Sequence, residues 1–258
     1  MTKHTIKLLN QINRNFYQTV ALEFDQTRQQ PWEGWDQLLP VIKHLGLQSS
    51  EHATSLRVLD LGCGNGRFGK YLADELESGG TRQSIKLMYT GVDSSDQLLA
   101  AAQVKFPEGK YVVHDIIEQL IEPDSPDLGE LPNNQDCVVA FGFLHHIPSS
   151  ELRLKFLERC RQATRVGGRA ILTAWHPTHS PSLMTRRSLP QTVGIDPSQL
   201  EPGDYLLDWQ RGASATRYCH DATLDELTKL IAQSPWQLEQ HFNADGRSSN
   251  MNTYLVLK

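Results

Sequence analysis

The sequence contains no apolar run close to the roughly 18 residues that a membrane-spanning helix needs, and its first residues lead into no signal-peptide core. We therefore expect a soluble, cytoplasmic protein that makes no contact with a membrane. Cysteine is scarce as well. The four cysteines (Cys63, Cys137, Cys160 and Cys219) include no C-x-x-C pair, so the sequence predicts neither a disulfide framework nor a zinc ribbon, and we expect no metal site.

The chain also lacks an excess of positive charge. Its 258 residues carry a formal net charge of −5, whereas a protein that binds nucleic acid unaided usually shows a basic face. An RNA substrate would therefore need a local basic patch or a helper subunit. The length favours one large α/β core with additions.

What the sequence does contain is an apolar run, residues 56–61, that breaks into glycines at alternate positions: Gly62, Gly64 and Gly66. Glycine permits the backbone angles of a tight strand-to-helix turn and lets a ligand approach the bare chain. A dinucleotide fingerprint needs its third glycine at position 67, where this chain has Arg67. A turn with a purely structural role is the alternative from this stretch alone.

Together with Asp60, the glycine turn resembles the first motif of the Rossmann-like methyltransferases that use S-adenosylmethionine. The resemblance implies that the turn cradles the amino-acid end of this cofactor. Asp93 ends the next predicted strand, where a carboxylate can accept both ribose hydroxyls, although a capping aspartate is the alternative. Asp115 ends the third predicted strand, where this fold commonly contacts adenine. The expected cofactor-binding residues are Asp60, Gly62, Cys63, Gly64, Asn65, Gly66, Asp93, Ser94, Asp115, Ile116 and Phe141.

Seven apolar stretches with interleaved helical patterns predict an α/β fold, a three-layer αβα sandwich around a mostly parallel seven-stranded sheet whose last strand is antiparallel. This is the Rossmann-like methyltransferase fold. The predicted strands cover residues 56–61, 85–93, 111–116, 136–143, 169–175, 236–242 and 253–258. Gly167 and Gly168 are predicted to end the helix that precedes the fifth strand.

We predict two parts in the chain. Residues 1–50 form an N-terminal helical segment with a lid, and residues 51–258 form the methyltransferase domain with an insertion at about 178–220. Apolar residues three or four apart over 4–25 predict one helix or a pair of helices. Residues 178–203 are rich in Ser, Pro, Gly and Arg. Such a segment is longer than a simple connecting loop in a compact domain, so a substrate-binding insertion or a lid is expected there.

Residues 16–32 resemble the Y-x-x-(I/V)-A-x-x-F-x-x-T-R-x-x-P-W signature of the methyltransferases that finish carboxymethyl uridine at the wobble position of tRNA. Residues 208–210 and 217–220 are similar to that family's P-W and R-Y-Y-H elements, with Asp208 and Cys219 as departures. The resemblance implies a tRNA substrate, methyl-ester formation on a carboxylate, and a small zinc-binding activator protein as partner.

An acceptor carboxylate is already ionised at neutral pH and needs no general base, so an arginine fork is the main requirement. Arg28 is the first candidate for this fork and Arg217 the second, although Arg28 could instead pair with an acid such as Glu23. The resemblance implies that the uridine pocket is shaped by Tyr17, Trp32, Tyr218 and His220. Trp32 could also simply pack on the core.

Two alternatives remain open at this point. A small-molecule O- or N-methyltransferase would need a base near the methyl group, and His145 or its neighbour His146 titrates in the right range. A catalytically silent protein could use the same fold to bind the cofactor or to scaffold a partner.

Overall fold

The computed structural model describes residues 1–48, 54–78, 85–124 and 131–258. The predicted boundary between residues 50 and 51 lies outside these described residues. No helix in the described ranges is both long enough and apolar enough to cross a membrane.

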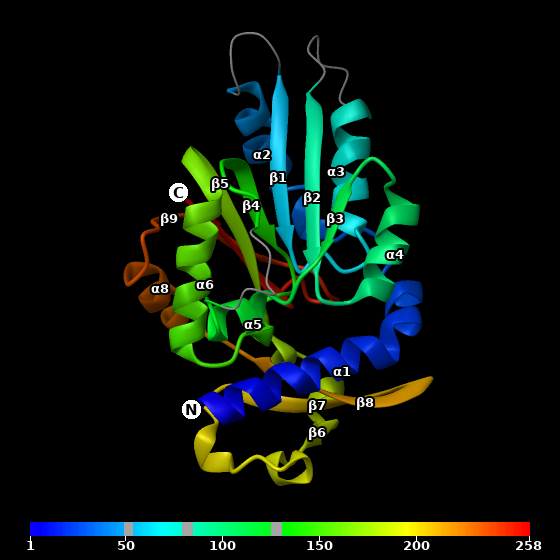
Figure 1. The fold of residues 1–258 in the computed structure, drawn as a ribbon, viewed down its shortest axis with the longest axis vertical. Coiled ribbons are helices and arrows are strands. Elements are labelled where there is room, and N and C mark those ends of the chain that lie inside the picture. The colour runs from blue at the N-terminus through cyan, green and yellow to red at the C-terminus, as the bar shows by residue number, and fades with distance from the viewer. Residues whose placement is uncertain (49–53, 79–84, 125–130) are drawn as a thin grey trace.

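A seven-stranded sheet in the order β3-β2-β1-β4-β5-β10-β9 forms the core of the molecule (Figure 1). The first five strands are parallel, and β10 runs antiparallel to both of its neighbours. The strands are β1 (Ser55–Leu61), β2 (Lys86–Asp93), β3 (Lys110–Val113), β4 (Gln135–Ala140), β5 (Thr164–Trp175), β9 (Leu238–Ala244) and β10 (Asn252–Leu257). The predicted mostly parallel sheet is confirmed.

Helices cover both faces of this sheet, because alternate residues of each central strand point to opposite sides. In β4, Val138 and Ala140 pack against α5, α6 and α8, whereas Cys137 and Val139 pack on the side of α2 and α3. The α-helices are α1 (Lys3–Thr27), α2 (Leu39–Leu47), α3 (Arg67–Ser78), α4 (Asp96–Lys105), α5 (Ile116–Ile121), α6 (Ser150–Ala163), α7 (Pro181–Met184) and α8 (Leu224–Ala232). Short 3-10 turns are η1 (Glu33–Trp35), η2 (Leu144–His146), η3 (Pro177–His179), η4 (Pro190–Val193) and η5 (Pro197–Gln199).

The predicted end of α6 at Gly167 and Gly168 is wrong. The helix ends at Ala163, and both glycines lie inside β5. At Gly168 a Cβ atom would lie 2.8 Å from the backbone oxygen of Asp136 on β4. The glycine is therefore required by close strand packing rather than by a helix end.

The insertion forms a second sheet in the order β6-β7-β8, made of β6 (Arg187–Ser188), β7 (Asp204–Arg211) and β8 (Ala213–His220). The sequence predicts an insertion here but does not predict its strands. Gly212, with φ of +79°, makes the tight turn between β7 and β8. We call α1 together with β6, β7 and β8 the cap.

The cap lies across the carboxyl ends of the main-sheet strands (Figure 1), with α1 between the two sheets. One face of α1 packs on the small sheet, where Phe16 and Val20 contact Trp209 and Leu9 contacts Tyr218. The side chain of Asn13 also accepts a hydrogen bond from the backbone N–H of Tyr218 over 2.8 Å. The cap is thus one packed unit.

Arg153 of α6 joins the cap to the main domain. Its side chain is 1% exposed and donates to Glu201 over 2.7 Å and to Glu226 of α8 over 3.1 Å. Glu201, Asp204 and His220 have ligand atoms close enough to resemble a metal site. Glu201 pairs with the Arg153 guanidinium, and Asp204 is hydrogen-bonded to Tyr218 and His220, so the chain itself accounts for the cluster.

We expect Arg153→Met to destabilise the fold by about 1–3 kcal/mol, because two partly buried carboxylates lose the charged group that donates to them. Urea unfolding followed by circular dichroism measures the change. The matched control on the same helix is Lys155→Met, whose exposed pair with Glu151 should contribute less than about 1 kcal/mol. Equal effects for the two substitutions would contradict this role for Arg153.

Candidate active site

A cavity of about 330 Å³ lies at the carboxyl edge of the main sheet, with α1 as one of its walls. The glycine turn, Asp93 and the end of β4 line one part of it, and Tyr17, Arg28 and Arg217 line another. Residues from positions 10 to 252 therefore meet in one site.

The glycine turn leaves bare backbone open to this cavity. Gly62, Gly64 and Gly66 all have positive φ values, of +77°, +53° and +69°, which disfavour other residues. A Cβ atom at Gly66 would lie 2.7 Å from the Cβ of Ala102, whereas one at Gly64 would meet no atom within 4 Å. Gly66 thus allows close packing of α4, and Gly64 presents its backbone to a ligand. Cys63 and Asn65 line the cavity beside it.

Asp93, at the end of β2, ties the glycine turn in place. One of its carboxylate oxygens accepts from Gly64 N–H and the other from Ser95 N–H, both over 2.9 Å. Burial raises the pKa of Asp93, against the backbone hydrogen bonds that lower it. Asp93 and the adjacent Ser94 both line the cavity, and each has oxygen lone pairs that can accept further hydrogen bonds, as a ribose site requires.

Asp60 ends β1 beneath the glycine turn and is 2% exposed. Burial raises its pKa to about 7, against the hydrogen bond that the Tyr89 hydroxyl donates over 2.6 Å. This bond fixes the carboxylate at the base of the cavity.

Asp115 and Ile116 line the cavity at the start of α5, and Phe141 lines it after β4. The Asp115 carboxylate caps α5 by accepting from Glu118 N–H over 2.9 Å. It also accepts from Asn10 over 3.0 Å and pairs with Arg14 over 3.4 Å, so α1 covers this end of the site. All cofactor-binding residues expected from the sequence thus lie at the cavity or in the turn beneath it.

Arg217 of β8 is 8% exposed and lines the other end of the cavity. Its guanidinium carbon lies 4.5 Å from the centre of the Trp175 ring and 5.4 Å from that of Phe16. Within the described ranges, no carboxylate forms an ion pair with Arg217. A buried cation among aromatic rings, without an acidic partner, is unfavourable unless an anionic ligand joins it.

Tyr17 lies next to this arginine and is fixed by His146. The backbone oxygen of Tyr218 lies 3.1 Å from His146 Nδ1, so we place the ring proton there; Nε2 then accepts from the Tyr17 hydroxyl over 2.7 Å. Burial raises the pKa of Tyr17, against the lowering effect of Arg217 and Arg28. The Tyr17 oxygen is therefore close to both positive charges.

Both histidines of the predicted pair line the cavity and are buried. Burial, with the charge of Arg217 nearby, lowers the pKa of His146 to about 3. Burial, with the neighbouring histidines and Arg217, also lowers that of His145 well below 6.5. The Nδ1 atom of His145 has no hydrogen-bond partner among the described residues. Both rings are neutral at physiological pH and are weak bases.

Arg28 and Trp32 approach the cavity from the segment after α1. The Arg28 guanidinium lies 4.7 Å from the Phe24 ring centre, and its backbone oxygen accepts from Asn65 of the glycine turn over 3.0 Å. Trp32 stacks on Trp35 at 5.5 Å and faces Gly142, where a Cβ atom would lie 3.2 Å from its ring. Trp32 therefore both packs against Trp35 and lines the cavity. Arg28 also lines the cavity, and its backbone is bonded to the cofactor turn.

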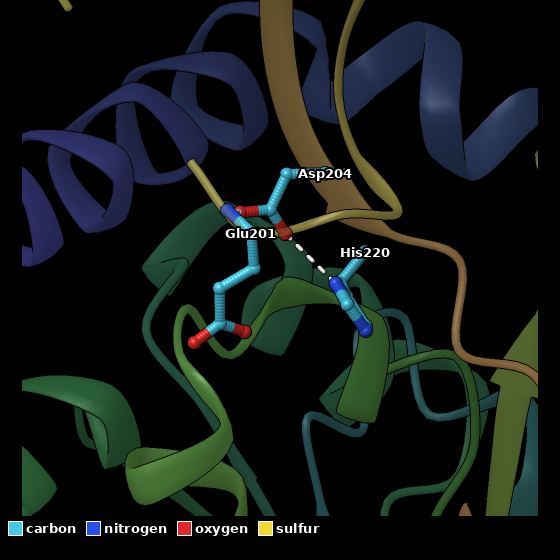
Figure 2. A group of neighbouring side chains, drawn as sticks. All are labelled: Glu201, Asp204 and His220. Atoms are coloured by element: carbon cyan, nitrogen blue, oxygen red, sulfur yellow. Dashed lines mark hydrogen bonds and ion pairs between the residues drawn. The ribbon is translucent and has the colours of Figure 1, made fainter. Parts of the chain in front are cut away.

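Tyr218 and His220 do not line the cavity, so the roles expected for them at the acceptor do not fit the structure. Successive residues of a strand point to opposite faces, and Arg217 faces the cavity. Tyr218 and His220 instead both hydrogen-bond to Asp204, over 2.7 and 2.8 Å, and His220 also contacts Glu226 over 2.8 Å. Figure 2 shows the His220 ring facing the Asp204 carboxylate.

Cavity residues on α1 and at the ends of β5 and β10 were not predicted from the sequence. Asn10, Asn13 and Arg14 fall with Tyr17 on one helical face, a polar spacing that could have indicated a second buried side of α1. Trp175 is the last residue of an apolar strand, at the edge where the other ligand residues were expected. Asn252 had no comparable signal.

Residues 59–170 match the family model described as a methyltransferase domain. A comparison with curated proteins gives no match. Among solved structures, DhpI in complex with SAH is 14% identical, with 97% of this chain and 96% of that chain covered and a TM-score of 0.60. Magnesium protoporphyrin IX methyltransferase (ChlM) from Synechocystis PCC 6803, with bound SAH, is 16% identical, with 96% and 98% covered and a TM-score of 0.58.

A further similar structure is an S-adenosylmethionine-dependent methyltransferase from Clostridium acetobutylicum ATCC 824, 14% identical, with 95% of this chain and 96% of that chain covered and a TM-score of 0.56. Identities this low establish the Rossmann-like fold alone, and residues 59–170 within it are similar to a methyltransferase domain. The open backbone at Gly64 beside Asp93 fits the S-adenosylmethionine cofactor that such a domain would use.

We expect Asp93→Ala to weaken binding of S-adenosylhomocysteine roughly 100-fold, because it removes the carboxylate that accepts from the turn and faces the ribose site. Isothermal titration calorimetry measures the affinity. Asp96→Ala is the matched control, since this exposed aspartate lies three residues away and outside the cavity. Unchanged affinity in Asp93→Ala would remove Asp93 from the cofactor site.

Proposed function

We propose that this enzyme transfers the methyl group of S-adenosylmethionine to a carboxylate oxygen and so forms a methyl ester. The observation that carries this proposal is Arg217, a buried guanidinium at the cavity with no carboxylate partner in the described ranges. An anionic acceptor would supply the missing partner, and an arginine fork matches the geometry of a carboxylate.

The lowered pKa values of the two histidines at the site agree with a reaction that needs no proton transfer. A carboxylate acceptor is ionised at neutral pH, and the lowered pKa values of His145 and His146 make both poor bases. The cofactor supplies an electrophilic methyl group. Arg217 and Tyr17 would orient the acceptor oxygen in line with it, and such alignment can contribute many powers of ten to the rate.

For the acceptor itself, we propose the carboxymethyl group of a wobble uridine in tRNA. The support is the T-R-x-x-P-W segment, whose Arg28 and Trp32 line the same cavity as Arg217. Trp32 is partly exposed there and offers an aromatic face on which a base can stack. A small zinc-binding activator would add basic surface to a chain of net charge −5.

A small-molecule carboxylic acid is the second candidate. It is favoured by the same net charge of −5, since a small anion needs only the local charge of Arg217 and no extended basic face. The neighbours with the same fold include a methyltransferase named for a small molecule, magnesium protoporphyrin IX.

The experiment that separates these acceptors is incubation with methyl-labelled cofactor and either total tRNA or a small-molecule extract. We expect label in tRNA, recovered as a methyl-ester nucleoside by mass spectrometry and released by mild alkali. Alkali-labile label confined to the extract would favour the small carboxylic acid. Alkali-stable label, as in an ether or an amine, would contradict carboxylate methylation.

We expect Arg217→Gln to lower methyl transfer at least 100-fold while leaving the affinity for S-adenosylhomocysteine within about threefold, because the lost interaction is with the acceptor. The rate of methyl transfer by Arg217→Lys should lie between those of the wild type and Arg217→Gln, because lysine keeps the positive charge but lacks the bidentate guanidinium. Arg187→Gln, on the exposed edge of the same small sheet, is the control. Because no carboxylate among the described residues pairs with the buried charge of Arg217, Arg217→Gln should not lower the melting temperature.

Full activity in Arg217→Gln would exclude this arginine as the acceptor group. Arg28→Gln, measured in the same assays, then tests the other predicted arginine. A loss of cofactor affinity in Arg28→Gln would place Arg28 at the cofactor instead.

A further inference from the structure

Asn65 makes contacts that reach beyond the cofactor turn in which it lies. Its side chain is 3% exposed and donates to the Asp25 carboxylate over 2.7 Å and to the backbone oxygen of Arg28 over 3.0 Å. Both amide hydrogens of Asn65 are thereby used on one segment, residues 25–32, which carries Arg28 and Trp32 to the cavity.

Two further contacts join the same segment to the elements around the turn. Lys105 of α4 lies 3.3 Å from the Asp25 carboxylate, and Arg67, directly after the turn, donates to the backbone oxygen of Gln30 over 2.7 Å. Burial alone would raise the pKa of Asp25, but the bonds from Asn65 and Lys105 outweigh it and lower that pKa. Asp25 is therefore a stable anionic anchor.

The direction of the Asn65 side chain depends on the backbone of the turn. Its neighbours Gly64 and Gly66 both adopt left-handed angles, with φ of +53° and +69°. Gly64 is the residue whose backbone is open to the cavity, so a cofactor that binds there fixes the backbone angles on the cavity side of Asn65, while α4 packs against Gly66 on the other side.

We propose that Asn65 is a positioning residue that couples cofactor binding to the placement of Arg28 and Trp32, so that the acceptor side of the site is assembled only after the cofactor is bound. The inference rests on the proposed methyltransferase function. Its consequence is an ordered reaction in which the cofactor binds first. When the bound cofactor has already made the turn and the segment rigid, acceptor binding costs less conformational entropy.

Hydrogen exchange in the presence and absence of saturating S-adenosylhomocysteine tests the coupling, read in peptides that span residues 22–35. In the wild-type chain we expect the ligand to slow exchange there by about tenfold. This is roughly the change in the opening equilibrium that one hydrogen bond to a charged group produces. Asn65→Asp places a carboxylate against Asp25 and should abolish most of this slowing.

The double variant Asn65→Asp with Asp25→Asn exchanges the two groups and should restore part of the effect, which a loss of fold could not do. Gln29→Ala is the matched control, because Gln29 bonds within the segment, to the backbone oxygen of Asp25, and makes no bond to the turn. It should keep the full ligand-dependent slowing.

The outcomes separate the two proposals. A wild-type chain that binds S-adenosylhomocysteine without slower exchange at 22–35 overturns the coupling and leaves the methyltransferase function intact. Equal slowing in wild type and Asn65→Asp overturns the role of Asn65. Failure of the wild-type chain to bind the ligand in calorimetry overturns both.

Discussion

The contact between α1 and the carboxyl edge of the main sheet is the interaction on which the site depends. A strand edge of this fold offers backbone groups and carboxylates, which suit a cofactor but cannot enclose an acceptor. Here α1 supplies the facing wall, with Asn10 and Arg14 over Asp115 at one end and Tyr17 beside His146 at the other. Its opposite face packs on the small sheet, so the helix serves both sides at once.

Charge is distributed unevenly along this cavity. Asp60, Asp93 and Asp115 lie on the sheet side, each engaged by a neighbouring donor. Arg217 lies on the cap side without an acidic partner among the described residues. The two sides thus differ in charge, as the proposed transfer from a sulfonium cofactor to an anionic acceptor requires, and the neutral His145 and His146 do not alter this difference at physiological pH.

The cofactor half of the site was predictable from the sequence because its determinants are local. Gly62, Gly64 and Gly66 need positive φ, and Asp93 follows a strand of clear apolar character. The acceptor half depends on contacts between distant segments. The R-Y-C-H stretch, residues 217–220, is one continuous motif in the sequence. Because alternate residues of a strand point to opposite faces, Arg217 lines the cavity, whereas Tyr218 and His220 bond to Asp204 and Glu226 on the other face. Neither Asn10 nor Trp175 belongs to a motif, so only the fold brings them to the site.

The bond between Asn13 and the backbone of Tyr218 spans 205 positions of the chain. During synthesis α1 emerges early, but the strand that covers its apolar face is made only when most of the sheet has already been translated. Until then Leu9, Phe16 and Val20 have no partner from the small sheet. The five parallel strands can thus collapse before the cap closes, and a newly made chain exposes the apolar face of α1 until β7 and β8 have been translated.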